Sequence, residues 1–212
     1  MKVMKFGGAS IRDSESLRQV AAIVARETEP RVVVLSAVFG QTNEIREFAQ
    51  KARKGKTDID LFIKTVRERH ETLATGAIDD RKAQGRALKE IDERMLTLEI
   101  LLYGVAYSGE LTDRTFDLVQ SYGERLANPL LEGTLISMGV GAKGLESDKI
   151  GMLTDGVHGN ATADLPATVQ NFKTSVIPEM AGGTVPIITG FFGSSPDGRC
   201  TTFGRNGSDY SA

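Results

Sequence analysis

The chain has 212 residues, of which 40% are hydrophobic and 25% charged, and its formal net charge is −2. This balance, without a long basic run, argues against a general nucleic-acid or membrane surface. One cysteine excludes an internal disulfide framework, and two histidines are too few for a His-rich metal cluster, so we assign no metal ligands. With no apparent signal peptide and no run of apolar residues that could span a bilayer, we expect a soluble, cytoplasmic protein of one large or two small domains.

The first predicted elements form a βαβ unit. Lys2–Phe6 is short and apolar-rich and precedes Gly7-Gly8, which is typical of a strand and a turn. Asp13 is a candidate N-cap for a helix whose apolar residues are spaced i, i+3, i+4 and i+7. Arg31–Leu35 is a continuous β-branched run, which favours a strand buried on both faces of a parallel sheet.

A helical excursion is predicted over about residues 44–140. One helix begins near Glu44, and a longer one is marked by Ile59, Phe62, Ile63, Val66 and Leu73. A third carries an apolar seam at alternating spacings of three and four, formed by Leu88, Ile91, Met95, Leu98 and Leu102. That seam fits either an antiparallel helical hairpin within the fold or a subunit interface, and its shortness favours the hairpin.

The remaining elements complete an α/β architecture. Leu111–Leu135 is predicted to be helical but interrupted at Gly123 and Pro129. Lys149–Leu153 and Thr184–Thr189 are strand candidates, with a loop rich in glycine, asparagine and threonine between them. We therefore expect a mainly parallel sheet sandwiched by helices. His70, near an apolar stripe, is expected to be structural, and Cys200 is expected to be an incidental small residue.

The turn after the first strand has features of a phosphate site. Lys5 stands at the strand end, and Gly7 and Gly8 would let backbone amides approach a phosphate. A lysine there could neutralise charge on a transferring phosphoryl group. The segment is neither a Walker A loop nor a GxGxxG motif. Alone, it is equally compatible with an ordinary βα turn that carries a surface lysine.

The segment SAVFGQTN follows the second strand. Ligands of open parallel sheets bind at the carboxyl ends of the strands, so this segment is expected to lie beside the KFGGAS turn. Ser36, Thr42 and Asn43 offer hydroxyl and amide groups to a polar ligand. The alternative for Thr42 or Asn43 is a capping role at the helix that begins near Glu44.

Three later segments add a carboxylate, an aromatic turn and an arginine. SYGERL places Glu124 beside a glycine, and GFFG, which contains Phe191, ends the TVPIIT strand. The final segment, TTFGRNGSDYSA, holds Arg205 together with Ser208 and Asp209. Arginine binds carboxylates through two parallel hydrogen bonds. A glutamate opposite it would bind an ammonium, so the pair suits a zwitterionic amino acid.

In this order, KFGGAS, SAVFGQTN, SYGERLA, TGFFGSS and TTFGRNGSDYSA closely resemble the aspartate kinases of the amino acid kinase family, from Lys2 to Ala212. The resemblance implies the amino acid kinase (carbamate kinase-like) fold and the use of ATP with Mg²⁺. In that family, ATP phosphorylates the side-chain carboxylate of L-aspartate, giving the acyl phosphate that feeds lysine, threonine and methionine synthesis. We also expect a homo-oligomer and, from the charge balance given above, no nucleic-acid or membrane partner.

The resemblance implies a role for each matching residue. Lys5 matches the catalytic lysine that contacts the migrating phosphoryl group, and Gly7 and Gly8 match the phosphate-approach glycines. The residues expected to bind the acceptor or to order the site are Ser36 and Thr42 for the side-chain carboxylate, Glu124 for the α-ammonium, Arg205 for the α-carboxylate, Phe191 as an aromatic wall, and Ser208 and Asp209 from the GSDY motif. Asp209 is expected to hold the catalytic lysine and the substrate amine in order.

Two departures from the family pattern bear on activity. Asn206 stands where the family commonly has glycine. The family's chain also continues beyond this motif, with the nucleotide-binding half and regulatory domains. We therefore expect residues 1–212 to be the N-terminal, aspartate-binding part of the kinase domain, with little activity alone and with a need for the missing half in cis or in trans. The alternative is a non-catalytic amino-acid-binding or assembly module of the same fold.

Overall fold

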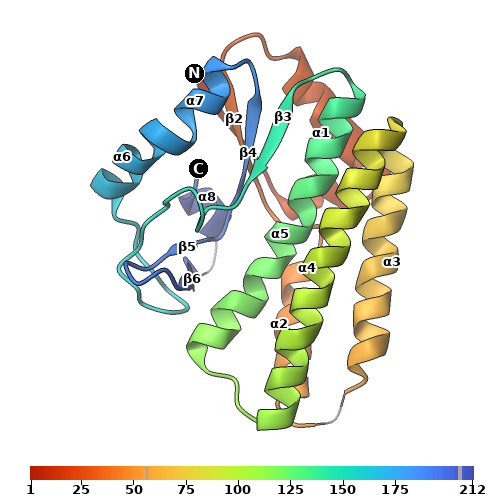
Figure 1. The fold of residues 1–212 in the computed structure, drawn as a ribbon, viewed down its shortest axis with the longest axis vertical. Helices are drawn as coiled ribbons and strands as arrows, with labels where there is room; N and C mark the ends of the chain where they lie inside the picture. The colour runs from red at the N-terminus through yellow and green to blue at the C-terminus, as the bar shows by residue number, and fades with distance from the viewer. Residues whose placement is uncertain (56, 205–206) are drawn as a thin grey trace.

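The protein is described here by a computed structural model covering residues 1–55, 57–204 and 207–212 (Figure 1). Within these residues a parallel sheet has the strand order β1-β2-β4-β3. Its strands are β1 (Lys2–Phe6), β2 (Arg31–Leu35), β3 (Ala142–Leu145) and β4 (Val185–Thr189). The two central strands, β2 and β4, are apolar-rich and almost wholly buried, as expected for strands covered on both faces.

Helices cover both faces of the sheet, and a small antiparallel ribbon follows β4 (Figure 1). The helices are α1 (Ser14–Arg26), α2 (Gln41–Ala52), α3 (Ile59–Ala77), α4 (Arg81–Ser108), α5 (Asp113–Ser137), α6 (Leu165–Ser175), α7 (Ile177–Ala181) and α8 (Gly207–Tyr210), with a 3₁₀ turn at Gly8–Ile11. The ribbon pairs β5 (Phe192–Ser194) with β6 (Cys200–Thr202). One face of the sheet packs on α1 and α5 with α3 and α4 beyond, and α6 and α7 cover the other. The predicted α/β sandwich is confirmed.

The predicted βαβ unit is also confirmed. β1 and β2 pair in parallel over their whole lengths, and α1 connects them. Asp13 caps α1: its carboxylate accepts the Ser16 backbone N–H at 2.8 Å, and the Ser16 hydroxyl oxygen accepts the Asp13 N–H at 3.0 Å. This reciprocal capping box satisfies donors that the first helical turn leaves free.

Helices α2 to α5 follow one another between β2 and β3. The seam residues Ile91, Met95, Leu98 and Leu102 of α4 are fully buried within the chain, between α3 and α5. The hairpin interpretation of the seam is therefore confirmed. His70 of α3 is buried in the same core, where its Nδ1 lies 2.8 Å from the Val66 carbonyl oxygen, and burial lowers its pKa to about 4. It is a neutral structural residue, as predicted.

The predicted interruptions at Gly123 and Pro129 are wrong, because α5 is continuous from Asp113 to Ser137. Nearly every residue from Val119 to Leu135 is buried, and this packing outweighs the intrinsic cost of glycine and proline in a helix. Gly123 serves a different purpose: a Cβ there would lie 2.8 Å from the Thr42 Oγ1 and 2.9 Å from the Ala37 Cβ. The glycine lets α5 lie directly against the loop after β2.

The predicted strand at Lys149–Leu153 is also wrong. These residues form turns, with only an isolated bridge between Leu153 and Ser194, and their apolar side chains pack beneath α6. The strand in this part of the chain is β3, whose sequence AKGL has little intrinsic β propensity. It pairs as an edge strand with β4. The pairing and not the local sequence therefore decides where this strand forms.

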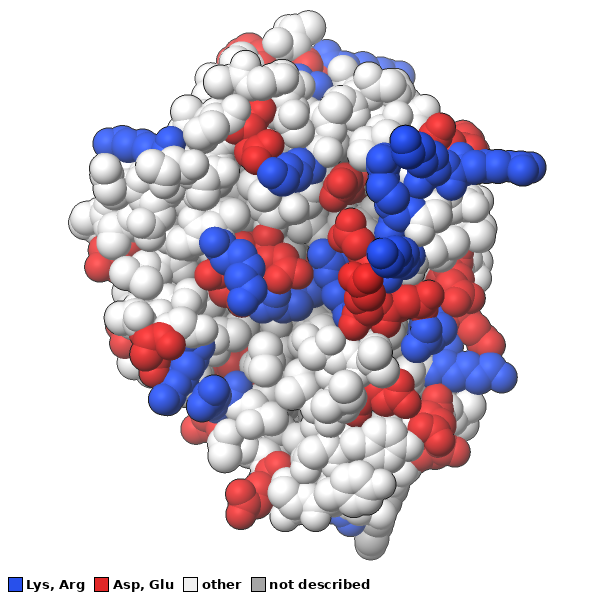
Figure 2. All heavy atoms as spheres, viewed as in Figure 1, with Lys and Arg blue, Asp and Glu red and all other residues white. Residues whose placement is uncertain are grey.

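Charged residues of both signs are interspersed over the face shown in Figure 2, with basic and acidic side chains adjacent to one another across its middle. None of the helices described combines the length and the apolar character that a membrane span requires.

Candidate active site

The carboxyl ends of β1, β2 and β4 open into a pocket of about 790 Å³ between the sheet, α2, α5 and the C-terminal segment. Every sequence-predicted site residue that the structure describes lines it: Lys5, Gly7, Gly8, Ser36, Thr42, Glu124, Phe191, Ser208 and Asp209. Asn43 lines it as well. Arg205 falls outside the described residues. Residues as far apart in the sequence as Lys5 and Asp209 are thus brought together at the carboxyl ends of the strands, where open parallel sheets bind their ligands.

Lys5 and Asp209 form an ion pair across one end of the pocket, with 2.6 Å between Nζ and Oδ1. Lys5 is the second-last residue of β1, and Asp209 is in α8. The two loops predicted to be neighbours are in contact, since a Cβ on Gly8 would lie 2.9 Å from the Ala37 carbonyl oxygen. A lysine beside closely packed glycines at a strand end suits an anion such as a phosphate.

Glu124 of α5 lines the same pocket and is buried. Its Oε1 accepts the Ala37 N–H at 3.3 Å and the Thr42 hydroxyl at 3.4 Å. Its Oε2 has no hydrogen-bond partner within the part of the chain that the structure describes. Burial raises the pKa of Glu124 to about 8, so the carboxyl group is mostly protonated at pH 7. A cationic ligand group at Oε2 would restore the ionised form.

The capping alternative for Thr42 and Asn43 is wrong. Helix α2 begins three residues earlier than predicted, and its N-cap is Gly40, whose φ of 78° is in the left-handed region that glycine favours. Thr42 is therefore in the first turn of α2, where its hydroxyl reaches Glu124. The helix start thus places a hydroxyl group beside the buried carboxylate.

The aromatic turn after β4 is fastened to the C-terminal segment. Phe191 has a φ of 77°, the only positive value among the non-glycine residues described. Its N–H donates to the Ser211 hydroxyl at 3.0 Å, and its carbonyl accepts the Phe203 N–H at 2.9 Å. Such strain persists only where surrounding contacts hold the backbone. Ser208 packs closely here too, since a Cβ on Gly190 would lie 2.7 Å from its Oγ.

Asp117 is a buried residue of α5 that the sequence reasoning missed. Its Oδ2 lies 2.9 Å from the His158 Nδ1 and accepts the Gly159 N–H at 2.9 Å and the Thr202 N–H at 3.2 Å. Its Oδ1 accepts the Thr202 hydroxyl at 2.6 Å. Gly159 and Thr202 both line the pocket, so one carboxylate fixes two segments of its wall.

A sequence signal for this part of α5 does exist. Polar residues recur every three or four positions along α5, at Asp117, Ser121, Glu124 and Asn128, and all four are buried. A polar stripe at helical spacing indicates a face that contacts a site or a hydrogen-bond network.

Arg46 of α2 was also missed. It lines the pocket together with Phe116 and Gln120 of α5. Its Cζ lies 5.8 Å from the centroid of the Phe116 ring, within the range of a cation–π contact.

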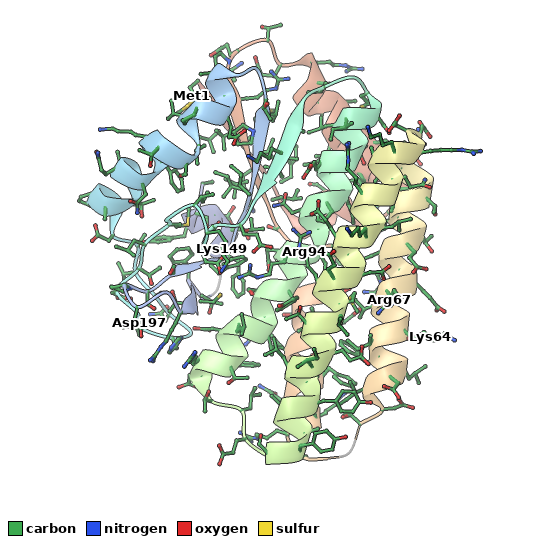
Figure 3. The ribbon with its side chains drawn as sticks, in the orientation of Figure 1. Met1, Lys64, Arg67, Arg94, Lys149 and Asp197 are labelled. Carbon is green, nitrogen blue, oxygen red and sulfur yellow. The ribbon has the colours of Figure 1, made fainter. Side chains whose placement is uncertain are left out.

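Arg125 follows Glu124 in the sequence but faces a different environment. Its Nε donates to the Ser121 hydroxyl at 2.9 Å, its Nη2 to Asp148 at 2.7 Å, and its Nη1 to Glu146. Its Cζ lies 4.5 Å from the centroid of the Phe192 ring. Arg94 reaches from α4 to the same Glu146, at 3.4 Å (Figure 3). The network ties α5 to the turn after β3 and to β5, beside the pocket.

Comparison with known proteins identifies the family. The model of the amino acid kinase family matches residues 1–212. The chain is 34% identical to lysine-sensitive aspartokinase 3 of Escherichia coli (strain K12) and 33% identical to the chloroplastic aspartokinase 3 of Arabidopsis thaliana. In each case 99% of this chain is covered, but only 44% and 37% of those proteins. The chain thus spans less than half the length of these relatives.

A solved structure is similar over the same extent. The crystal structure of E. coli aspartokinase III in complex with aspartate and ADP superposes with a TM-score of 0.87 at 28% identity, covering 99% of this chain and 45% of that one. The structure of the same enzyme with lysine and aspartate gives the same values. The family model matches the whole sequence and the fold is similar over the same extent, so the chain belongs to the amino acid kinase family.

Proposed function

We propose that this chain forms the acceptor-binding part of an aspartate kinase, which phosphorylates the side-chain carboxylate of L-aspartate to 4-phospho-L-aspartate, the first step of lysine, threonine and methionine synthesis. The observation that carries the proposal is the convergence of Lys5, Glu124 and Asp209 on one pocket. The aspartokinase names of the similar proteins support it, as does the aspartate bound in the E. coli structure.

Glu124 is the residue proposed to recognise the substrate amine. Its Oε2 is buried in the pocket wall without a partner in the described chain, and an α-ammonium group would complete it. Thr42 and Ser36 line the pocket nearby and offer hydroxyl groups to the side-chain carboxylate. Arg205, through the family resemblance, is proposed to bind the α-carboxylate.

Lys5 is proposed to neutralise charge on the transferred phosphoryl group. Asp209, at 2.6 Å, holds the Lys5 ammonium in place, and Gly7 and Gly8 leave room for phosphate oxygens. ATP with Mg²⁺ would supply the phosphoryl group. In this proposal Mg²⁺ bridges the nucleotide phosphates and neutralises part of their charge. The Lys5–Asp209 pair favours a kinase over a pure binding module.

The proposal is tested by calorimetric titration of L-aspartate at pH 7 in two buffers with different ionisation enthalpies. Since Glu124 has a pKa of about 8 in the free protein and must ionise to meet an ammonium, binding is expected to release about one proton. Succinate, which lacks the amine, should bind more weakly and release none. Glu124→Gln should abolish the proton release and weaken aspartate binding.

The results separate the parts of the proposal. Absence of aspartate binding to the wild-type chain would overturn the acceptor assignment. Binding with the same proton release in Glu124→Gln would overturn the role of Glu124 alone. Kinase activity is assayed separately as ADP release, and we expect little from these residues alone.

A further inference from the structure

The side of the pocket formed by α2 and α5 carries an arginine without an assigned role. Arg46 is four residues after Thr42 on α2, so the two share one helix face, about 6 Å apart along the axis. Thr42 donates to Glu124, and Phe116 lies beneath the guanidinium. Arg46 therefore stands one helical turn from Thr42, whose hydroxyl contacts the buried carboxylate, and it lines the same pocket.

Among the charged residues described in the pocket lining, Arg46 is the one whose charge no neighbour balances. The charged residues described in its lining are Lys5, Arg46, Glu124 and Asp209. Lys5 and Asp209 neutralise one another at 2.6 Å. Glu124 is mostly uncharged at pH 7 in the free protein. Arg46 makes no ion pair with any residue that the structure describes, so this wall of the pocket attracts an anionic group.

We propose that Arg46 is a specificity-determining residue that binds the α-carboxylate of the acidic amino acid whose ammonium group binds Glu124. The ammonium and the α-carboxylate of an amino acid share one carbon atom, so a cation on the α2–α5 wall that carries Thr42 and Glu124 can meet that carboxylate. The planar guanidinium fits a carboxylate bidentately, and its stacking on Phe116 limits the freedom lost on binding. Arg46 would act together with Arg205, which the family resemblance assigns to the same group. This inference rests on the proposed function.

The test compares Arg46→Gln with a matched control, Arg53→Gln. Arg53 is exposed at the C-terminal end of the same helix and does not line the pocket. Calorimetry with L-aspartate is expected to give an approximately fivefold higher Kd for Arg46→Gln, as for a partly solvated ion pair, and no change for Arg53→Gln. Arg46→Lys should give an intermediate Kd, because lysine keeps the positive charge but cannot form the two parallel hydrogen bonds of a guanidinium.

A second ligand identifies the group that Arg46 contacts. The α-amide of L-aspartic acid keeps the amine and the side-chain carboxylate but lacks the α-carboxylate. Its Kd should be the same for the wild-type chain and for Arg46→Gln. Equal losses for both ligands, or an L-aspartate Kd for Arg46→Gln that matches that of Arg53→Gln, would overturn the inference while leaving the proposed function intact. If the wild-type chain binds no aspartate, both fail.

Discussion

Glu124 and Arg125 are adjacent on α5 and both are buried, yet their surroundings differ in kind. The pocket-facing carboxylate receives two long hydrogen bonds and leaves one oxygen without a partner in the described chain. The arginine, which faces β5 and the turn after β3, is matched by two carboxylates, a hydroxyl and an aromatic ring. Each guanidinium nitrogen of Arg125 thus has a partner within the fold, whereas the Glu124 carboxyl group keeps one oxygen for which a ligand could supply the partner.

The largest expected effect on stability comes from removing Arg125 from its network with Glu146 and Asp148. Arg125→Met would leave Glu146 and Asp148 without their main counter-charge, so we expect a loss of about 3–5 kcal/mol in the free energy of unfolding. Urea denaturation measures it. The matched control is Arg67→Met, because Arg67 of α3 (labelled in Figure 3) pairs with Asp92 of α4 in an ion pair that is much more exposed to solvent than the Arg125 network. The control should lose at most about 1 kcal/mol. Similar losses of unfolding free energy for both variants would show that the buried Arg125 network contributes no more to stability than an exposed ion pair.

Asp117 sharpens the comparison, since it is a buried carboxylate on the same helix whose two oxygens are both engaged. Asp117→Asn keeps the shape but presents an NH₂ group to N–H and O–H donors. We expect a loss of about 1–3 kcal/mol and weaker aspartate binding, because the Gly159 and Thr202 walls lose their common anchor. Unfolding experiments and calorimetry measure both. A variant as stable as the wild type would contradict the anchoring role.

The raised pKa of Glu124 should make the free energy of unfolding depend on pH. Glu124 has a pKa of about 8 in the folded chain against 4.5 for an unperturbed glutamate, so the folded state holds this proton more tightly. Its contribution to stability is therefore present in full below about pH 4.5 and is lost as the pH rises through about 8. The difference in unfolding free energy between Glu124→Gln and the wild type should accordingly grow over this range in favour of the variant. A constant difference would mean that Glu124 titrates normally.

The smallest expected effect is on the reactivity of Cys200, which lies beside Arg125. Its Sγ is 4.0 Å from the Arg125 Nη2, and burial raises its pKa to about 12. Reaction with a thiol reagent should be slow in the folded wild-type chain, since the thiolate is the reactive form. Arg125→Met should accelerate it by opening the region. Equally slow reaction in the variant would show that the local packing does not depend on Arg125.

The same contrast explains what the sequence could predict. β1, α1 and β2 are specified by local patterns, and the parallel arrangement predicts that the segments after β1 and β2, with Lys5 and Ser36, lie side by side. The roles of Glu124 and Asp209 came instead from the resemblance of their motifs to those of a known family. These signals act over a few residues, and each is consistent with its neighbours.

The features that the sequence did not predict depend on contacts between segments far apart in the chain. β3 is a strand because β4 pairs with it, and α5 passes through Pro129 because its surroundings hold it. Asp117 is meaningful only when its partners at positions 158, 159 and 202 are known. Arg46 resembles any exposed helical arginine until Phe116 of α5 is placed beneath it.

The contact at Gly123 has a consequence for redesigning acceptor selectivity. Because a single added methyl group there would collide with Thr42 and Ala37, this wall cannot be moved outward by changing side chains. A longer acceptor would therefore need room where its side-chain carboxylate is proposed to lie, at the part of the lining formed by Ser36 and Lys5. Replacing Phe116 would instead remove the ring that contacts Arg46.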